Sequence, residues 1–454
     1  MADKTNSPEY KTDFLFNVRD FGASSDNPDN TPAFQKAIDQ CAGAGGGIVL
    51  VPPGNYALGM TELRDFVELR IERGALLRSI LQPVPDPLKK AKEPTCNSRR
   101  FLLGGVNIRH AAITGEGIID GCGTDLFWDI DPTKEYPIFG QRWWPKLHRP
   151  KGLIHFRESS NIIISGVTIK NPPAYTIWTL GCENLQIKHI TIDTPLESPN
   201  TDGLDIDCCS NVKIEGCCIS TGDDAIAIKS DINVLGYDRP CENIIVTGCI
   251  LKTSSCGIRL GYEGDGEIRN CIFSNCVIYD SMIGISLMSV LDADNQRGTI
   301  IQKGPKINDV IFSDLVIDAL QTFNFQHLKC SQGQLIGKID RISFHNITAS
   351  AKRGSYMGGM EDQPIGQLNF SHVSMRLSGP MGKDFLNQVP DPYPIWNDLA
   401  YYGLPWAYFV RNVEKVHFSN CTVSLTNQAI GDWQNEPLKT VNVKHCRQEI
   451  DFEE

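Results

Sequence analysis

A short strand-like unit recurs along most of the chain, and this repeat restricts the possible folds more than any other feature. The unit opens with a polar residue, continues with alternating apolar residues and ends in a turn, as in "NIIISGVTI" from Asn161. Later units begin, in chain order, at Asn184, Asn211, Asn243, Asn270, Asp309, Arg341, Gln367 and Lys415. A period of two indicates strands, and the connections, rich in Gly, Pro, Asn and Ser, show no helical pattern.

The spacing of the units indicates how these strands are arranged. Successive units lie 23, 27, 32, 27, 39, 32, 26 and 48 residues apart. One short strand per repeat cannot bury its own apolar face, whereas stacked coils bury it between neighbours. The sequence therefore predicts an all-β fold, a right-handed parallel β-helix built as a single-stranded solenoid. Insertions are expected where the spacing grows.

One helical segment precedes the repeats, in "DNTPAFQKAIDQCAGAGGG". Asn30 or Thr31 can cap this helix, Pro32 suits its first turn, and the glycines end it. Because a solenoid needs cover over its first coil, we expect a short N-terminal capping helix. "GIVLVPPGNYAL", residues 47–58, would then form the first strand. The predicted organisation is a polar N-terminal tail over residues 1–15 and one β-helix domain over residues 16–447.

The charge and the hydropathy pattern exclude several classes of partner. The formal net charge is −11, which disfavours nucleic acid. No run of about 18 apolar residues is present, so no membrane span is expected. Residues 1–15 lack the apolar core of a signal peptide. The chain as written is expected in the cytoplasm, or outside it if a leader has been removed, and its oligomeric state stays open.

The chain has 16 cysteines, and several of them recur at one position of the repeat. One position of each unit is filled, along the chain, by Val167, Ile190, Cys217, Cys249, Cys276, Leu315, Ile347, Val373 and Cys421. Cysteine alternates there with aliphatic residues, which predicts packing in an inward stack. No pair of CxxC motifs is present, so no zinc site, other metal or cofactor is predicted.

A second strand before each unit carries the polar residues of interest. Aligning these strands gives three ladders: Tyr175, Asp202, Asp224, Cys256 and Ile283; then Trp178, Asp205, Ala227, Arg259 and Ser286; then Leu180, Asp207, Lys229, Gly261 and Met288. Successive rungs should lie about 4.8 Å apart. Asp202 and Asp224 are therefore predicted to be near neighbours. Gly222 can allow Asp223 to turn toward them, which would gather three carboxylates at one cleft.

The same face carries an aromatic ring and two cations. We expect Trp178 to offer a platform for a sugar, and Lys229 and Arg259 to contact a ligand. The alternatives are that Trp178 only packs and that Lys229 only pairs with Asp207. Crowded carboxylates raise one another's pKa, which suits acid–base chemistry.

The motif "NTDGLDID", followed one coil later by "GDDAIAIKSD", resembles the polygalacturonase-like glycoside hydrolases of family 28, which degrade pectin. The resemblance implies an inverting hydrolase of plant cell-wall polysaccharide or its oligosaccharide fragments, with residues 16–447 as the catalytic domain. By the same resemblance, Asp223 would be the general acid, Asp202 and Asp224 would activate the attacking water, and Asn200 would order the site.

The sequence departs from the family at two places. The usual Gly-His-Gly is "SCG" at residues 255–257, and the usual Arg-Ile-Lys, which contacts a galacturonate in polygalacturonases, is "SLM" at residues 286–288. We therefore expect a neutral or differently placed sugar on the leaving-group side, with Arg259 as a relocated anion contact, rather than a standard polygalacturonase. The aromatic-rich insertion between Phe370 and Phe418 favours exo action, because it could close one end of the cleft.

Two other classes of function fit the same residues. A β-helix lyase or epimerase could bind Ca²⁺ through Asp202 and the Asp223–Asp224 pair, with Arg259 or Lys229 as the base. Its unsaturated product would absorb ultraviolet light, and a chelator would stop it. A non-catalytic carbohydrate-binding solenoid would bind sugar without turnover.

Overall fold

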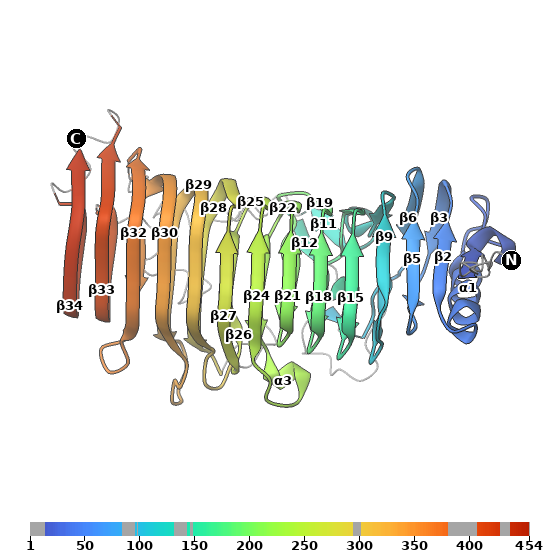
Figure 1. Ribbon diagram of the computed structural model, residues 1–454, viewed down its shortest axis with the longest axis horizontal. Helices are drawn as coiled ribbons and strands as arrows, with labels where there is room; N and C mark the ends of the chain where they lie inside the picture. Colours follow the sequence, from blue (N-terminus) through green and yellow to red (C-terminus); the bar gives the residue numbers. More distant parts are fainter. Residues whose placement is uncertain are drawn as a thin grey trace, which may run out of the picture.

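Parallel strands stack along one long axis, from helix α1 at the N-terminal end to strand β34 at the C-terminal end (Figure 1). The computed structural model describes residues 14–83, 96–97, 99–130, 143–145, 149–293, 301–379, 406–426 and 436–453. This arrangement confirms the predicted parallel β-helix.

The central coils each contain three short strands. From β14 to β25, each strand pairs in parallel with the third strand after it, as β15 does with β18 and β18 with β21. The first face holds β14 (Gly152–Arg157), β17 (Tyr175–Leu180), β20 (Leu204–Asp207), β23 (Ile226–Ser230) and β26 (Cys256–Gly264). The second holds β15 (Ser160–Ser165), β18 (Glu183–Lys188), β21 (Ser210–Glu215), β24 (Cys241–Thr247) and β27 (Glu267–Ser274). The third holds β16 (Thr168–Lys170), β19 (Thr191–Asp193), β22 (Cys218–Thr221) and β25 (Ile250–Thr253).

Shorter strands build the first coils and longer, bent ones the last. The first coils contain β1 (Leu15–Asn17), β2 (Gly47–Val51), β3 (Gly54–Leu58), β4 (Thr61–Glu62), β5 (Val67–Ile71), β6 (Ala75–Ser79), β8 (Leu103–Val106), β9 (Ala112–Gly115) and β10 (Ile118–Asp120). The last contain β28 (Val277–Leu291), β29 (Lys306–Lys329), β30 (Lys338–Arg353), β31 (Ser355–Gly358), β32 (Ile365–Leu377), β33 (Tyr408–Leu425) and β34 (Leu438–Glu453). β34 thus continues beyond residue 447.

Two small sheets and three short helices accompany the solenoid. β7 (Cys96–Asn97) pairs with β13 (Arg149–Pro150), and β11 (Trp128–Ile130) pairs with β12 (Trp143–Pro145). The short helices are the 3₁₀ turn Val18–Phe21, α2 (Gly123–Leu126) and α3 (Ile232–Leu235). None of the helices in the described ranges is long and apolar enough to cross a membrane.

Helix α1 (Thr31–Gly43) covers the first coil, as predicted. Its buried stripe consists of Ala33, Phe34, Ala37, Ile38 and Cys41. The prediction for the first strand was wrong in two respects. β1 precedes the helix and pairs with β2, and residues 47–58 form two strands because Pro52 and Pro53 interrupt the segment.

The interior is an apolar column of stacked rungs. Ile177, Leu204, Ile226, Ile258 and Ile285 stand on successive coils and are fully buried. All nine residues of the predicted aliphatic and cysteine stack are also buried. The four cysteines of this stack therefore pack in the core, as their alternation with Val, Ile and Leu predicted.

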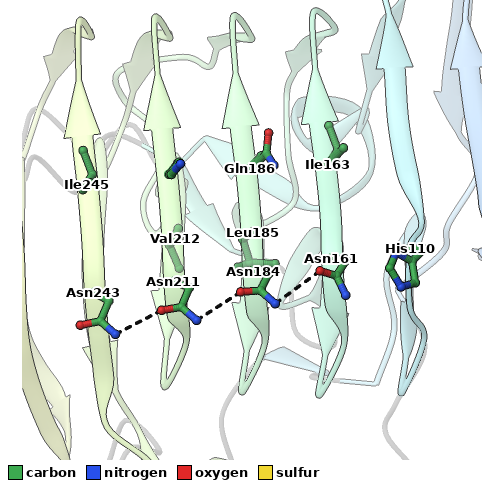
Figure 2. Close-up of a pocket in the computed structure, with 11 residues that line it drawn as sticks. His110, Asn161, Ile163, Asn184, Leu185, Gln186, Asn211, Val212, Asn243 and Ile245 are labelled. Atoms are coloured by element: carbon green, nitrogen blue, oxygen red, sulfur yellow. Dashed lines mark hydrogen bonds between the residues drawn. The ribbon is translucent and has the colours of Figure 1, made fainter.

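An asparagine ladder follows the first residues of the repeat units. Asn161, Asn184, Asn211 and Asn243 have φ values of 57°, 57°, 58° and 57°, a left-handed conformation that asparagine tolerates well. The side-chain amides of Asn184, Asn211 and Asn243 each donate to the amide oxygen of the asparagine on the preceding coil (Figure 2). The asparagine that opens these units therefore makes the turn and also links the coils.

Candidate active site

The polar ladders of the first face stack in the predicted register. Trp178 pairs with Asp205, Asp205 with Ala227, and Ala227 with Arg259. The backbone amide of Gly203 donates to the carbonyl of Asp224, which places Asp202 and Asp224 on neighbouring coils. The acidic strands therefore meet on one face of the solenoid.

One rung departs from the prediction. The offset between paired residues of β23 and β26 is 32 at Ile226 and Ile258 but 34 at Ser230 and Gly264, so a bulge interrupts the ladder. Lys229 consequently does not pair with Gly261. The bulge instead brings Glu263 to the acidic cluster, although "GYEGDGE" gave no sign of a buried carboxylate.

Gly222 determines how the chain enters the acidic pair. A Cβ atom at this position would lie 2.1 Å from the carbonyl oxygen of Ser198 and 2.8 Å from Oγ1 of Thr201. The Gly222 amide donates to Oγ1 of Thr201 at 3.2 Å. The glycine is thus required by the close approach of two backbone segments, and this approach sets the position of Asp223.

Asp223 is the most accessible of the three predicted catalytic carboxyls, since it is partly exposed while Asp202 and Asp224 are buried. Its Oδ2 accepts a hydrogen bond from the Asn200 amide at 3.1 Å, and its Oδ1 accepts one from the Asp224 amide at 3.0 Å. Burial and, after it, the Asp224 carboxylate raise the pKa of Asp223 from 3.8 to about 6. The group can therefore keep a proton in mildly acidic solution.

Three donors surround the carboxylate of Asp224. Its Oδ2 lies 2.7 Å from Nη2 of Arg259, and its Oδ1 accepts hydrogen bonds from Oγ of Ser255 at 2.8 Å and from the Cys256 amide at 3.2 Å. These contacts suit an ionised acceptor. The neighbours Asp223 and Asp224 therefore have distinct environments, one at the surface and one beside a cation.

Asp202 lies between these groups and a second cation. Its Oδ2 is 3.5 Å from Nζ of Lys229, and its buried Oδ1 has no hydrogen-bond partner among the described residues. Burial, followed by the charge of Asp205, raises the pKa of Asp202 well above its ordinary value. The cluster has more acids than cations, and Asp202 is where the surplus negative charge is least favourable.

Lys229 has a different role from the predicted ligand contact. It is 1% exposed, and its Nζ lies 2.7 Å from Asp205 and 3.2 Å from Glu263. It also stands 4.1 Å from the ring centroid of Tyr175. The alternative pairing with Asp207 is wrong too, because Asp207 Oδ1 accepts the Asp231 amide instead. Lys229 is a buried counter-ion beneath the site.

Arg259 is occupied in the same way. It is 7% exposed and binds Asp224, with Glu263 Oε2 at 3.4 Å. Burial alone would raise the pKa of Glu263. The charges of Lys229 and Arg259 outweigh burial and lower this pKa to about 2. The predicted free anion contact at Arg259 is therefore not supported, since two carboxylates already balance its charge.

Trp178 packs below the cleft. It is 1% exposed, its ring stacks on His155 with centroids 4.3 Å apart, and Nζ of Lys151 lies 4.5 Å from its centroid. Burial lowers the pKa of His155 to about 4, so this ring is neutral at ordinary pH. These contacts argue against the predicted sugar platform and favour the packing alternative.

Asn200 lies beside the general-acid candidate, as the motif implied. Its own φ is 56°, and its Oδ1 accepts a hydrogen bond from Nη2 of Arg149 at 2.7 Å. Arg149 is 2% exposed and also donates to the carbonyl of Pro173 at 2.9 Å. Sequence patterns gave no sign of Arg149, which lies three residues before the start of β14 and, through Asn200, stabilises the turn next to Asp223.

The positions that depart from the family sequence are neutral. Ser286 is fully buried and next to Arg259 in the ladder, and Met288 is 1% exposed and packs with Val290. Ser255, in place of a family glycine, bonds to Asp224. The coils that follow the acidic cluster therefore place no cation at residues 286–288.

A hollow on another face has a different character. It lies over β15, β18, β21 and β24 and is lined by the asparagine ladder (Figure 2). Its amides are hydrogen-bonded to one another, and the carboxylate cluster does not contribute to its lining. The hollow is therefore separate from the carboxylate cluster of the first face.

The comparisons with known proteins identify the family of the chain. The sequence profile of glycosyl hydrolases family 28 matches residues 48–389, so the chain belongs to this family. A grapevine (Vitis vinifera) protein described as "Probable polygalacturonase" is 30% identical over 291 residues, which is 59% of this chain and 55% of that protein.

Two solved structures share the fold. The hyperthermoactive exopolygalacturonase from Thermotoga maritima has a TM-score of 0.66 at 23% identity and covers 80% of this chain and 87% of its own. The family 28 exopolygalacturonase from Yersinia enterocolitica has a TM-score of 0.68 at 18% identity and covers 96% of this chain and 78% of its own. The predicted family, fold and glycoside hydrolase class are confirmed.

Proposed function

We propose that the protein is an inverting glycoside hydrolase acting on pectin-type polysaccharide or its oligosaccharide fragments. Asp223 would protonate the leaving oxygen, and Asp224 and Asp202 would activate the attacking water. The observation that carries this assignment is the contrast between adjacent carboxyls. Asp223 is accessible with a pKa of about 6, whereas Asp224 is buried against Arg259.

The division of roles follows from these environments. An inverting hydrolase needs a protonated acid on one side of the scissile bond and an ionised base on the other. The Arg259 ion pair supports Asp224 as the principal base. Because the pKa of Asp202 is raised, we assign it to orienting the water through its unpartnered Oδ1.

The lyase or epimerase alternative fits the buried cations less well. Burial alone would lower the pKa of Lys229. The charges of Asp205 and Glu263 outweigh burial and raise this pKa well above its usual value, so Lys229 is a poor base. Lys229 and Arg259 also occupy the carboxylates that a Ca²⁺ ion would need. Within the described ranges, no three His, Cys, Asp or Glu residues gather as a metal site.

The leaving-group side would receive a neutral sugar. Ser286 and Met288 replace the basic residues of the family motif, and neither can make a charge-assisted bond to a uronate. Exo action is also proposed, because two solved structures with this fold are named exopolygalacturonases. Residues 380–405 of the insertion expected to close the cleft lie outside the described residues.

The test is a screen of defined pectin fragments, including galacturonan and oligosaccharides with neutral sugars. We expect new reducing ends without ultraviolet absorbance, and no sensitivity to a chelator. An unsaturated product would favour the lyase. Sugar binding without turnover would favour the non-catalytic solenoid. Release of single sugars from one chain end would establish exo action.

A further inference from the structure

Glu263 adds a carboxylate to a cluster that already holds three buried aspartates around Lys229 and Arg259. It is 8% exposed. Burial raises its pKa, but the charges of the two cations outweigh burial and lower it to about 2, so Glu263 stays ionised. A buried anion costs free energy even when it is paired. A carboxylate that stays charged at such a position is therefore a candidate for a functional role.

The backbone around Glu263 is shaped to turn this side chain inward. Three of the four residues in "GYEG" have a positive φ, which is 85° at Gly261, 72° at Tyr262 and 99° at Gly264. A Cβ atom at Gly264 would lie 2.1 Å from the carbonyl oxygen of Ser230. Tyrosine rarely adopts this left-handed conformation, and such conformations cluster where a functional site requires them. The bulge thus brings Glu263 to the cluster at a local cost.

The two carboxylate oxygens of Glu263 divide between the two buried cations. Oε1 lies 3.2 Å from Nζ of Lys229, and Oε2 lies 3.4 Å from Nη2 of Arg259. Arg259 also binds Asp224 at 2.7 Å, and Lys229 also faces Asp202 at 3.5 Å. Each of these two catalytic candidates therefore shares its cation with Glu263.

Asp223 lies next to this network and is sensitive to its charge. Burial and then the Asp224 carboxylate raise the pKa of Asp223, whereas the Arg259 guanidinium lowers it. An opposite charge a few ångströms away typically lowers the pKa of a carboxyl by about 1–3. Glu263 offsets the Arg259 charge from 3.4 Å, so it limits this lowering.

Arg259 connects the surroundings of Glu263 with those of Asp223. Besides Arg259, the charged or titratable groups that face Glu263 are Lys229, Lys151, Tyr175, Asp205 and Asp231. Those that face Asp223, again besides Arg259, are Asp224, Asp202 and Cys256. Burial holds the pKa of the Tyr175 hydroxyl well above its usual value, so this partner of Glu263 stays neutral. Because Arg259 occurs in both sets, it can transmit the charge of Glu263 to Asp223.

From these contacts we propose that Glu263 is a positioning residue for hydrolysis. It holds the two buried cations beneath the carboxylates and offsets their charge, so that Asp223 keeps its proton. The inference rests on the proposed function and assigns one more residue to it. Glu263 would act through Arg259 rather than touch the substrate.

The first experiment follows the titration of the Asp223 carboxyl by carbon-13 NMR, with the signal assigned by its loss in Asp223→Asn. We expect Glu263→Gln to lower the pKa of Asp223 from about 6 to about 5, because the Arg259 charge is no longer offset. Glu263→Asp keeps the negative charge and should keep the pKa at about 6. Glu267→Gln removes a partly exposed carboxylate on β27 and is the matched control, which should leave the pKa unchanged.

A charge-balanced variant separates this electrostatic role from a packing role. Arg259→Gln combined with Glu263→Gln removes one cation together with the anion. The pKa of Asp223 should then return to about 6 or rise above it. A packing role predicts instead that the double variant is no closer to the wild type than Glu263→Gln. The double variant also carries the test if Glu263→Gln alone is too unstable to measure.

Kinetics then connect the titration with hydrolysis. In Glu263→Gln, kcat should fall above about pH 5 instead of about pH 6, which makes it about tenfold lower at pH 7, while KM and kcat at low pH change little. A lowered pKa of Asp223 without any hydrolysis would support the link between the two residues and contradict the hydrolase alone. Hydrolysis with the same pH profile in Glu263→Gln and the wild type, or an unchanged pKa of Asp223, would overturn this inference.

Discussion

The two sides of the acidic cluster share one backbone frame but differ in charge. The earlier coils present Lys151 above the Trp178 ring, whereas the later coils present the neutral Ser286 and Met288. Parallel strand pairing extends over both sides, with one bulge between β23 and β26. The comparison shows that the solenoid fixes the spacing of the rungs, while the charge of the side chains they carry differs from one side of the cluster to the other.

The largest expected effect is the fall in kcat when Asp223, the proposed general acid between the two sides, is replaced. Asp223→Asn should lower kcat by about 10²–10⁴-fold, because the leaving oxygen loses its proton donor. The loss should be the same for acidic and neutral substrates, since the residue belongs to neither side. Initial rates on several substrates measure this.

The matched control for Asp223 is Asp309→Asn. Asp309 is an exposed aspartate that pairs with Arg341 far along the solenoid. It should keep wild-type rates. A loss confined to one substrate class would instead assign Asp223 to substrate binding.

Removing the carboxylate that joins the two buried cations should affect stability. Glu263→Gln leaves Lys229 and Arg259 without a shared counter-charge, and breaking a buried pair costs about 3–5 kcal/mol. Denaturant unfolding measures the change. Glu267→Gln is the control, because Glu267 is a partly exposed partner of Arg269 on the next strand. Equal effects would show that Glu263 is not part of the network.

The pH dependence of kcat should follow the titration of Asp223. A general acid with a pKa of about 6 is protonated below that pH, so kcat should fall above pH 6, by about tenfold per pH unit. Rates between pH 4.5 and pH 8 on a saturating substrate test this. A profile that stays flat to pH 8 would contradict the assignment.

The smallest expected effect is the pH-dependent contribution of Asp223 to the stability of the fold. The folded-state pKa of Asp223 is raised from 3.8 to about 6, so its contribution to stability is full below pH 3.8 and is lost as the pH rises through 6. Asp223→Asn should therefore unfold at a higher temperature than the wild type at pH 7.5. The difference should shrink toward pH 4.5, and the opposite trend would contradict the raised pKa.

Much of the fold could be predicted from the sequence because period-two alternation fixes which residues point inward. The register of Trp178, Asp205, Ala227 and Arg259 followed from aligning the apolar positions alone. The first strand was misplaced because β1 is only three residues long and gives no periodic signal.

The site could be predicted less completely, for physical reasons. The bulge in β26 adds two residues to the offset, and only the folded chain shows that it brings Glu263 inward. Lys229 and Arg259 were expected to face a ligand, but the cluster contains enough acids to occupy both. Arg149 contacts Asn200 and Lys151 contacts the Trp178 ring from coils before the motif, where no pattern marks them.

The central claim is inversion by the Asp202, Asp223 and Asp224 carboxyls, and the anomeric configuration of the first product tests it most directly. Proton NMR during the first minutes of hydrolysis identifies the anomer before it equilibrates. The proposed mechanism predicts that the configuration at the cleaved bond is inverted. A product that keeps the substrate's configuration would contradict it, because retention requires a covalent intermediate and a different division of roles among the three carboxyls.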